Sequence, residues 1–389
     1  MTLPIEKIHV LLIYRVMIPS VRLCGHCQME ELARLGLVDY RAEKVEELKD
    51  DDLNWADIVF LGRLDSWYEH HLAKRLSRAG KYLIYILDDD LLHIPQGLSS
   101  SAYYSLRQVR DHISGMIGVS NAVLSPSPLL LEKYAGGKRR GIRVMEPAVD
   151  PVAYRPHGPA EPVRIGFAGS MDRMEDVEQI LGQVLPQIRK TYGEKVCFEF
   201  FGPLPSFAGE LDARHIPYCD SYDEYRKTLN DLAWDIGLAP MPDTPFHACK
   251  HYNKFTEYAA AGIVGIYSDV SPYTRLKEEI GIGVFCKNTV QAWYEAISGL
   301  IENGERREQL RESATRCASE RFSVAAAVEG LWQQLEECGV SGHRGRKRMY
   351  FTKWSRYPDY IVRVVWFFRR NGLKAPVAAL KKLIPAFKK

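Results

Sequence analysis

Apolar runs of strand length alternate with helix-length amphipathic segments along the first 145 residues. The predicted strands are Ile8–Val16, Val38–Tyr40, Ile58–Leu61, Tyr82–Leu87, Ile117–Val119 and Arg143–Met145. The predicted helices are Gln28–Leu35, Glu43–Leu48, Trp67–Ala79, Tyr103–Ser114 and Pro128–Tyr134. Continuously apolar strands separated by helices are typical of a parallel sheet that is covered on both faces.

The same alternation resumes after a proline-rich passage at residues 146–162. The predicted strands are Arg164–Ala168, Val196–Phe201, Trp234–Ala239 and Ile263–Tyr267, and the predicted helices are Glu175–Tyr192, Tyr222–Asn230, Lys254–Ala261, Gln291–Asn303, Glu305–Phe322 and Val324–Cys338. We therefore predict an α/β protein with two doubly wound, Rossmann-like domains that face a cleft. The predicted boundaries are an N-terminal domain at 1–150, a linker at 151–162 and a C-terminal domain at 163–340.

Composition adds a basic tail to this picture. The 389 residues are 46% hydrophobic and 26% charged, as in an ordinary globular protein. Residues 341–389 hold 14 Lys and Arg against one acidic residue, Asp359, so their net charge is +13 and the other 340 residues together carry −10. Such an asymmetry indicates an anionic partner for the tail.

The tail also contains large apolar side chains among its basic residues, including Trp354, Trp366, Phe367 and Phe368. This mixture is typical of helical segments that lie on anionic membranes, so we predict a membrane-binding amphipathic tail at 341–389. Nucleic-acid binding fits the charge but not the apolar run, and we expect no nucleic-acid partner. The remaining alternative is a pair of C-terminal helices that pack on the acidic body.

Three further features predict a cytoplasmic protein that lies peripherally on the inner face of the membrane. Acidic Glu6 and basic Lys7 precede the first apolar run, which is unlike a secretory signal. No apolar run approaches the ~20 residues needed to span a bilayer. The eight cysteines are scattered and form no disulfide framework, so we expect reduced thiols.

The loop after the predicted strand Trp234–Ala239 carries the clearest chemistry. It contains His247, Lys250 and His251, and the next predicted helix begins with Lys254 and contains Glu257. Open α/β sheets bind ligands beyond the carboxyl ends of their strands, where helix N-termini present free N–H groups. Two lysines followed by a glutamate at such a place suit a phosphorylated ligand with an attached sugar.

The motifs in this region resemble a known family. DIGLAP, PF-x-x-x-K in TPFHACK, KFTEYAAAG and SDVSPY occur in that order, with VRIGFAGS and FEFFGPLP upstream. Together they resemble the nucleotide-sugar-binding half of retaining GT-B glycosyltransferases of the group 1, or family 4, type. Within that group they are most similar to the bacterial polysaccharide-assembly and spore-maturation-like branch. YILDDDLLHIP and EPAVDPVAYRP extend a looser resemblance into the first half.

The resemblance implies roles for individual residues. Lys250, Lys254 and Arg173 would stabilise the charge that develops on the donor diphosphate, next to the loop that contains Gly169 and Ser170. Glu257 would hold the ribose hydroxyls through two O–H···O⁻ bonds. His247 and His251 depart from the asparagine and serine that the close branch often has at these positions, and as two histidines that flank Lys250 they are our own candidates for contacts with sugar hydroxyls. The wider family has a second, sugar-contacting glutamate eight positions before Glu257, where this chain has Cys249.

Candidate acceptor-side residues follow a strand in the first half. Asp88 and Asp89, with Asp90, and the nearby His93 are predicted to face the cleft and to orient the acceptor hydroxyl. The alternatives for the three carboxylates are a helix cap or turn cluster and a divalent cation site. We expect no metal and no cofactor, because a GT-B architecture usually stabilises the leaving group with cationic side chains.

Two other motifs resemble sites for redox, zinc or dinucleotide chemistry, but their sequences fit those sites poorly. CGHC at 24–27 has the spacing of a redox or zinc motif, but its sequence context favours an acceptor-side loop instead. GFAGS has only Gly166 and Gly169, and so lacks the G-x-G-x-x-G spacing of a dinucleotide site.

The sequence thus predicts a retaining glycosyltransferase of the hexosyltransferase type. It would move a sugar from a nucleoside diphosphate-sugar to a hydroxyl of a glycan or lipid-linked glycan, in cell-surface polysaccharide assembly. Two alternatives stay open. One is a nucleotide-sugar epimerase of the same fold, and the other is a catalytically silent transferase-like binding protein, which Cys249 keeps in play.

Overall fold

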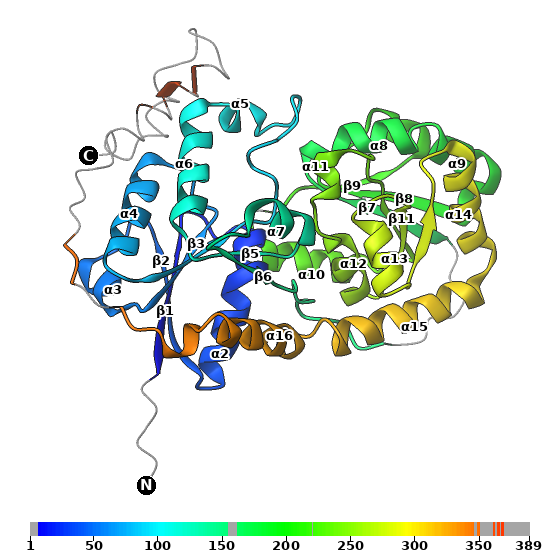
Figure 1. Cartoon of the computed structure of the whole chain (residues 1–389). Coiled ribbons are helices and arrows are strands. Elements are labelled where there is room, and N and C mark those ends of the chain that lie inside the picture. Colours follow the sequence, from blue (N-terminus) through cyan, green and yellow to red (C-terminus); the bar gives the residue numbers. More distant parts are fainter. Residues whose placement is uncertain are drawn as a thin grey trace. The chain divides into compact units, whose positions relative to one another are not determined.

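The computed structural model describes residues 7–154, 162–219, 221–345 and 348–350, together with residues 361, 364, 365, 367 and 368. Two compact units make up the chain, Met1–Met145 with Val328–Lys389 and Glu146–Ala327 (Figure 1). The second boundary falls within a helix, so residues 328–340, predicted to belong to the C-terminal domain, group with the first unit. Each unit is described by itself below.

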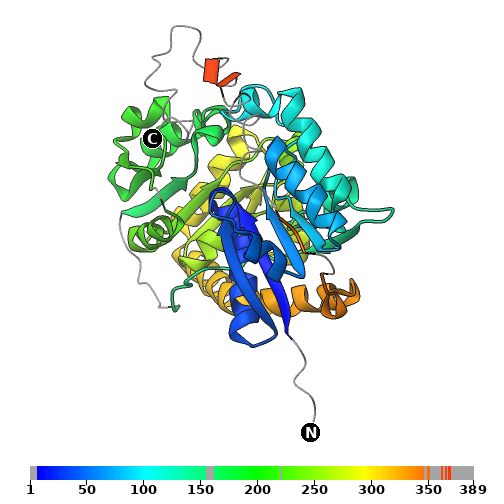
Figure 2. The same cartoon turned by 90° about the vertical axis from the view of Figure 1, so that its left-hand side faces the viewer.

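The first unit contains a six-stranded, all-parallel sheet in the order β2-β1-β3-β4-β5-β6. Its strands are β1 (Ile8–Tyr14), β2 (Val38–Lys44), β3 (Ile58–Gly62), β4 (Tyr82–Ile86), β5 (Ala122–Ser125) and β6 (Arg140–Arg143). Its helices are α1 (Pro19–Val21), η1 (Arg22–His26), α2 (Cys27–Arg34), α3 (Asp50–Trp55), α4 (Trp67–Arg78), α5 (Ser101–Tyr104), α6 (Arg107–Val119), α7 (Pro128–Tyr134) and η5 (Val340–Gly342). Helices α4 and α6 pack on each other and on β4 (Figure 2).

The second unit contains another parallel six-stranded sheet, in the order β12-β11-β10-β7-β8-β9. Its strands are β7 (Val163–Ala168), β8 (Val196–Phe201), β9 (Arg214–Ile216), β10 (Ile236–Ala239), β11 (Val264–Ser268) and β12 (Val284–Cys286). Its helices are η2 (Met171–Arg173), α8 (Met174–Leu181), α9 (Val184–Tyr192), η3 (Gly193–Lys195), η4 (Ser206–Leu211), α10 (Tyr222–Leu232), α11 (Pro245–Ala248), α12 (Asn253–Ala260), α13 (Tyr273–Glu279), α14 (Val290–Glu302) and α15 (Gly304–Glu320); α16 (Val324–Glu337) spans the boundary between the units.

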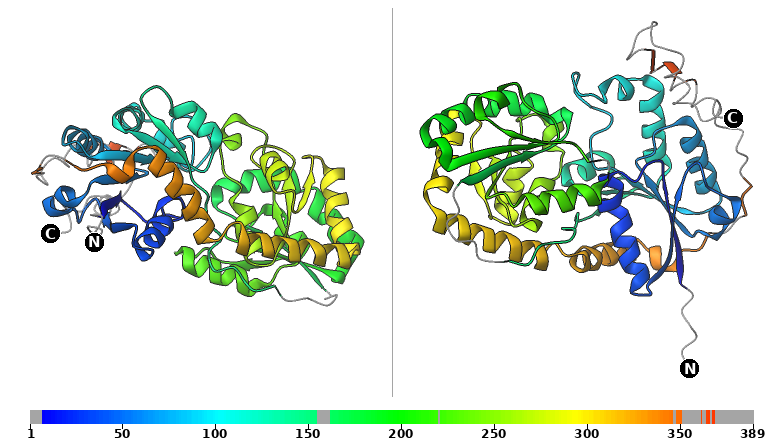
Figure 3. Two further views of the ribbon diagram at one scale, coloured as in Figure 1. Left: turned by 60° about the horizontal axis from the view of Figure 1, so that its bottom comes forward. Right: turned by 180° about the vertical axis from the view of Figure 1, so that it is seen from behind.

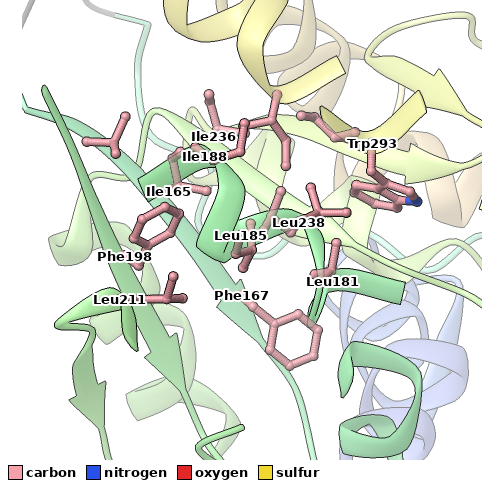
Figure 4. Close-up of a cluster of buried hydrophobic side chains, with 14 of the residues drawn as sticks. Ile165, Phe167, Leu181, Leu185, Ile188, Phe198, Leu211, Ile236, Leu238 and Trp293 are labelled. Carbon is pink, nitrogen blue, oxygen red and sulfur yellow. The ribbon is translucent and has the colours of Figure 1, made fainter. Parts of the chain in front are cut away.

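The two faces of the second sheet pack in different ways. On one face, alternate strand residues such as Ile165, Phe198 and Leu238 form a core with α8, α9 and α14, in which Trp293 is fully buried (Figure 4). On the other face, α12 and α15 pack together (Figure 3). A Cβ on Gly166 would lie 2.0 Å from the ring of Trp234, so this glycine makes room for an indole. Gly166 therefore has a packing role in this unit.

Side-chain caps set the starts of several helices. Ser66 accepts the N–H of Glu69, whose own carboxylate accepts the N–H of Ser66, so α4 begins with a complete capping box. Ser221 and Thr289 accept N–H groups in the first turns of α10 and α14. All three helices begin within one residue of the predicted positions.

Five predicted elements differ clearly from the structure. The predicted helix Tyr103–Ser114 is divided between α5 and α6, and the predicted strand Arg143–Met145 overlaps β6 only at Arg143. Ile117–Val119 is the last turn of α6 rather than a strand. The segment predicted as helix Glu43–Leu48 begins in β2, which pairs with β1 as far as Lys44. The predicted helix Glu175–Tyr192 is divided at Gly182 into α8 and α9, because in one continuous helix the ring of Pro186 would clash with the carbonyl of Gly182.

The start of the predicted basic tail is fixed to the first unit, whereas its residues from 351 onward, apart from 361, 364, 365, 367 and 368, lie outside the described residues. Met349 and Asn54 exchange two hydrogen bonds, at 2.6 and 3.0 Å. The N–H of Gly345 donates to Asp57 at 2.9 Å. In the part of the chain that the structure describes, no helix combines the length and apolar character of a bilayer span.

Candidate functional site

The site residues predicted in the second half lie at the carboxyl edge of the second sheet. Strands β7 and β10 are neighbours, and the connections that leave them run in opposite directions across the sheet. Open α/β sheets bind their ligands at such a switch point. The segment after β7 carries Gly169, Ser170 and Arg173, and the segment after β10 carries His247 and Lys250.

Asp176 joins these two segments. Its Oδ2 lies 3.2 Å from Nη1 of Arg173 and 3.9 Å from Nε2 of His247. Burial raises the pKa of its carboxyl, and Arg173 and Lys250 oppose that shift. Two predicted cations and one predicted histidine therefore surround one buried carboxylate. Sequence reasoning missed Asp176, although its spacing of three residues from Arg173 in a first helical turn was a usable signal.

Helix α11 fixes the orientation of His247. The Oγ1 atom of Thr244 accepts the backbone N–H of His247 at 3.2 Å and lies 2.7 Å from Nδ1 of the same residue. Because this hydroxyl oxygen already accepts from the backbone, its own proton is available to Nδ1. When the hydroxyl donates to Nδ1, the ring proton lies on Nε2, the nitrogen that faces Asp176. His251 has different surroundings, since it is buried and packs on the ring of Tyr252.

Lys250 and Cys249 end the α11 segment. Nζ of Lys250 lies 4.8 Å from the ring centroid of Phe246. The backbone carbonyl of Lys250 accepts a hydrogen bond from Nη2 of Arg275 at 2.8 Å. The backbone of Lys250 is thus held in place while its ammonium remains half-buried at the sheet edge. Cys249 is the C-cap of α11 and is buried. The position where the resemblance expects a carboxylate therefore holds a buried thiol.

Helix α12 places Lys254 and Glu257 one turn apart. Nζ of Lys254 lies 2.6 Å from Oε2 of Glu257, and the hydroxyl of Tyr225 donates to the same oxygen at 2.8 Å. Lys254 also donates to the Tyr225 hydroxyl at 3.0 Å. Burial, followed by the charge of Glu257, raises the pKa of Tyr225 well above its ordinary value, so this phenol stays a donor. Glu257 is therefore a buried hydrogen-bond acceptor in the middle of α12.

Burial raises the pKa of the fully buried Tyr273 to about 12, and the charges of Arg173, Glu257 and Asp176 also act on this phenol. Asp176 links the segment after β7 to α11 through His247, and Lys254 and Glu257 lie in α12 of the same unit.

The backbone at the ends of β7 and β8 is closely packed. Gly202 has φ +110°, and a Cβ at this position would lie 2.2 Å from the carbonyl oxygen of Gly169. The N–H of Gly169 donates to the carbonyl of Phe201 at 3.1 Å. Glycine is therefore required at 202 both by the backbone conformation and by the contact with the loop at 169–170.

A second charged network, not predicted from the sequence, lies at the carboxyl edge of the first sheet. Arg15 follows β1, and its guanidinium contacts Glu69 at 2.7 Å and Asp65 at 3.0 Å. The hydroxyl of Tyr103 donates to Asp65 at 2.9 Å. Arg63 follows β3, the next strand in the sheet, and all these groups lie at the switch point of the first unit.

The predicted acceptor-side residues have separate partners within this network. Asp88 and Asp89 lie 3.2 and 3.8 Å from Nη1 of Arg63. Asp90 is buried, and its carboxylate accepts hydrogen bonds from Lys133 at 2.6 Å and from Tyr134. Nδ1 of His93 lies 2.9 Å from Oδ1 of Asp90. Among the described residues, no group of three or more His, Cys, Asp or Glu is placed to hold a metal ion. The aspartates are engaged by basic side chains rather than directed at a common point, which disfavours the cation-site alternative.

The CGHC segment is helical and not an acceptor-side loop. Arg22–His26 forms a π-helix that continues into α2. Cys24 is fully buried, whereas a dithiol motif needs an accessible first cysteine. The eight cysteines, all of them among the described residues, form no disulfide.

The fold is the two-domain α/β fold found in GT-B glycosyltransferases. HepE of Anabaena, solved with UDP and glucose, is similar at 13% identity and TM-score 0.57, with 85% of this chain and all of HepE covered. Sucrose-phosphate synthase of Thermosynechococcus elongatus is similar at 12% identity and TM-score 0.58, with 86% of this chain and 100% of that chain covered.

A Listeria monocytogenes protein assigned as a UDP-N-acetylglucosamine 2-epimerase is similar at 10% identity and TM-score 0.54, with 89% and 100% covered. No protein-family model and no curated protein sequence matches this chain. At these identities the likeness establishes the fold.

Proposed function

We propose that this protein is a retaining glycosyltransferase that uses a nucleoside diphosphate-sugar. The observation that carries the proposal is the convergence of Arg173 and Lys250, from two different strand ends, on the switch point of the second sheet. Lys254 and Glu257 lie at the same edge. Structures of this fold have been solved with UDP and glucose or with UDP-glucose, which supports a nucleotide-sugar donor.

In the proposed reaction, each of these residues has a separate role. Arg173, Lys250 and Lys254 stabilise the negative charge that grows on the diphosphate as the glycosidic bond breaks. Glu257 accepts two hydrogen bonds from the ribose hydroxyls. These hydroxyls take the place of the donors Tyr225 and Lys254, which contact its carboxylate in this structure. The acceptor hydroxyl attacks from the face that the leaving phosphate departs from, and that phosphate takes its proton. No metal or cofactor is part of the proposal.

Calorimetry of the full chain with UDP-, GDP- and dTDP-sugars tests the donor site. We expect one nucleotide series to bind, and Glu257→Ala to lower its affinity about tenfold or more, the usual effect of losing hydrogen bonds to a charged group. Glu278→Ala, an exposed glutamate on α13, is the matched control and should bind like the wild type. If the wild type binds none of the three series, the donor-site proposal is refuted.

An epimerase is the second candidate, because an epimerase-like structure shares the fold. The two activities differ in their need for an acceptor. An epimerase converts the bound sugar when donor and enzyme are alone, whereas a transferase releases nucleoside diphosphate in proportion to added glycan acceptor. The third possibility is a catalytically inactive binding protein, which would bind the donor but form no product. It stays open because the position of the family's sugar-contacting glutamate holds the buried Cys249. Chromatography of the products separates the three.

The proposed acceptor is a glycan or a lipid-linked glycan of a cell-surface polysaccharide, reached at the inner face of a bacterial membrane. The basic composition of the tail supports attachment to an anionic surface, since each basic residue near such a surface contributes about 1 kcal/mol. Co-sedimentation with anionic liposomes should be lost in a chain that ends at Tyr350. This truncation keeps the hydrogen bonds of Gly345 and Met349 to the first unit. Equal sedimentation of the two chains would contradict membrane attachment through the tail.

A further inference from the structure

Asp176 is the acidic side chain that pairs with Arg173 in the proposed donor site, as Glu257 pairs with Lys254. Its carboxylate touches Arg173 at 3.2 Å, and 11% of its side chain remains exposed. Arg173 and Lys250 donate hydrogen bonds and suit phosphate oxygens. A sugar presents hydroxyl groups, and the O–H donor of each one needs an acceptor that a cation cannot supply. Asp176 supplies a charged acceptor beside the two cations.

The partner of Asp176 across the site strengthens this assignment. Nε2 of His247 lies 3.9 Å from Oδ2 of Asp176, beyond the length of a direct hydrogen bond. With its proton on Nε2, His247 is a donor that faces an acceptor. A ligand hydroxyl is the kind of group that accepts from the first and donates to the second. Thr244 holds the ring in this orientation.

We infer that Asp176, paired with His247, recognises a hydroxyl of the transferred sugar. This inference rests on the proposed function and deepens it: the cations bind the diphosphate, and Asp176 distinguishes a nucleotide-sugar from the bare nucleotide. It also supplies a carboxylate to a site in which Cys249 is a buried thiol.

A different role for Asp176 makes the opposite prediction. Asp176 lies in the first turn of α8, where an acidic residue stabilises a helix N-terminus, and it also neutralises Arg173 and Lys250. If it were only a counter-ion, its neutralisation would leave more net positive charge at the site. Every phosphorylated ligand would then bind more tightly, and by the same factor with or without a sugar.

The test compares two dissociation constants in the full-length Asp176→Asn variant. Calorimetry is performed with UDP, GDP and dTDP, and then with the nucleotide that binds carrying glucose, galactose, N-acetylglucosamine or mannose. Glu175→Gln is the matched control, because Glu175 is exposed, adjacent in sequence and in the same helical turn. Asn and Asp have the same shape, and thermal unfolding of each variant confirms that it is folded.

We expect Asp176→Asn to bind the bare nucleotide within about threefold of wild type, and to lose about ten- to hundredfold in affinity for the preferred nucleotide-sugar. Glu175→Gln should change neither. Equal changes for the nucleotide and for all four sugars, or no change at all, would overturn the role of Asp176 while leaving the donor site intact. Absence of nucleotide binding in the wild type would instead refute the proposed function itself. If Asp176→Asn fails to fold, His247→Gln is measured in the same way, and loss of sugar discrimination is the expected result.

Discussion

Glu69 is a buried charge with four hydrogen-bond donors around its carboxylate, and its removal has a calculable effect. Oε1 accepts two bonds from Arg15, at 3.1 and 2.7 Å, and Oε2 accepts the backbone N–H groups of Asp65 and Ser66 at 2.8 and 2.9 Å. The residue is 1% exposed. Burial alone would raise the pKa of this carboxyl, but Arg15 and the backbone donors lower it. Glu69 is therefore ionised in the folded protein.

In Glu69→Gln, the amide group must face either the guanidinium or the two backbone N–H groups, so one set of donors meets another donor. Loss of one partner from a buried ion pair costs about 3–5 kcal/mol. The lower figure applies, because Asp65 still contacts Arg15 at 3.0 Å. For a unit of this size, a loss of about 3 kcal/mol lowers the melting temperature by roughly 6–12 °C.

Hydrogen exchange assigns this loss to one unit. Amides of α4 should exchange faster in Glu69→Gln, while those of β7 and β10 stay as in the wild type. Asp111→Asn is the control: its ion pair with Arg107 on α6 is exposed, and its removal should change stability by less than about 0.5 kcal/mol. If Glu69→Gln were as stable as this control, Glu69 could not be a charged partner of Arg15, and the network described above would be wrong.

The pH dependence of the same variant provides a second check. Because the folded-state pKa of Glu69 is lowered, its stabilisation is present above its ordinary pKa and is lost as the pH falls through the folded-state value. The wild type should therefore lose stability on acidification below about pH 4 more steeply than Glu69→Gln.

Three further predictions concern stability and the site backbone. Burial raises the pKa of Asp176, so its charged form destabilises the fold at neutral pH, and Asp176→Asn should melt at the same temperature as the wild type or higher. Burial alone would raise the pKa of Asp90, but hydrogen bonds from Lys133, Tyr134 and His93 lower it. Urea unfolding should therefore show a lower free energy of unfolding for Asp90→Asn than for the wild type at pH 7. The difference between the two free energies should shrink below about pH 4. Gly202→Ala should destabilise by more than about 1 kcal/mol and weaken nucleotide binding, because its Cβ would displace the Gly169 carbonyl; wild-type nucleotide affinity in this variant would show that the loop does not touch the ligand.

The sequence pattern predicted most strands and helices, because their apolar runs are long and their periods distinct. It failed where an element is short or its burial depends on partners. Met116 and Ile117 are apolar because they are the buried positions in the last turn of α6, and a short apolar run does not reveal which period it follows. Strands β9 and β12 have only three residues each and lie at the edges of their sheet, and neither was predicted.

For charged residues too, the sequence shows groups that lie in one segment but not partners that come from different segments. His247, Lys250, Lys254 and Glu257 could be identified together because they lie in one stretch after one strand. Arg15 and Glu69 are 54 positions apart, and nothing local in the sequence links them. They meet because β1 and β3 are neighbours, so that residues just beyond both carboxyl ends share one edge of the sheet. Charge networks of this kind require the strand order.

Asp176 lies between these two cases. Asp176 lies three residues after Arg173, and this spacing in a helix predicts their ion pair from the sequence. Its proximity to His247, 71 positions later, depends on β7 lying beside β10 and could not be predicted in this way. Because β7 and β10 are neighbours, the loop that carries Arg173 and Asp176 meets the loop that carries His247 and Lys250. The proposed sugar contact at Asp176 needs no change of fold relative to a contact at position 249, because both loops follow strands that meet at the same switch point.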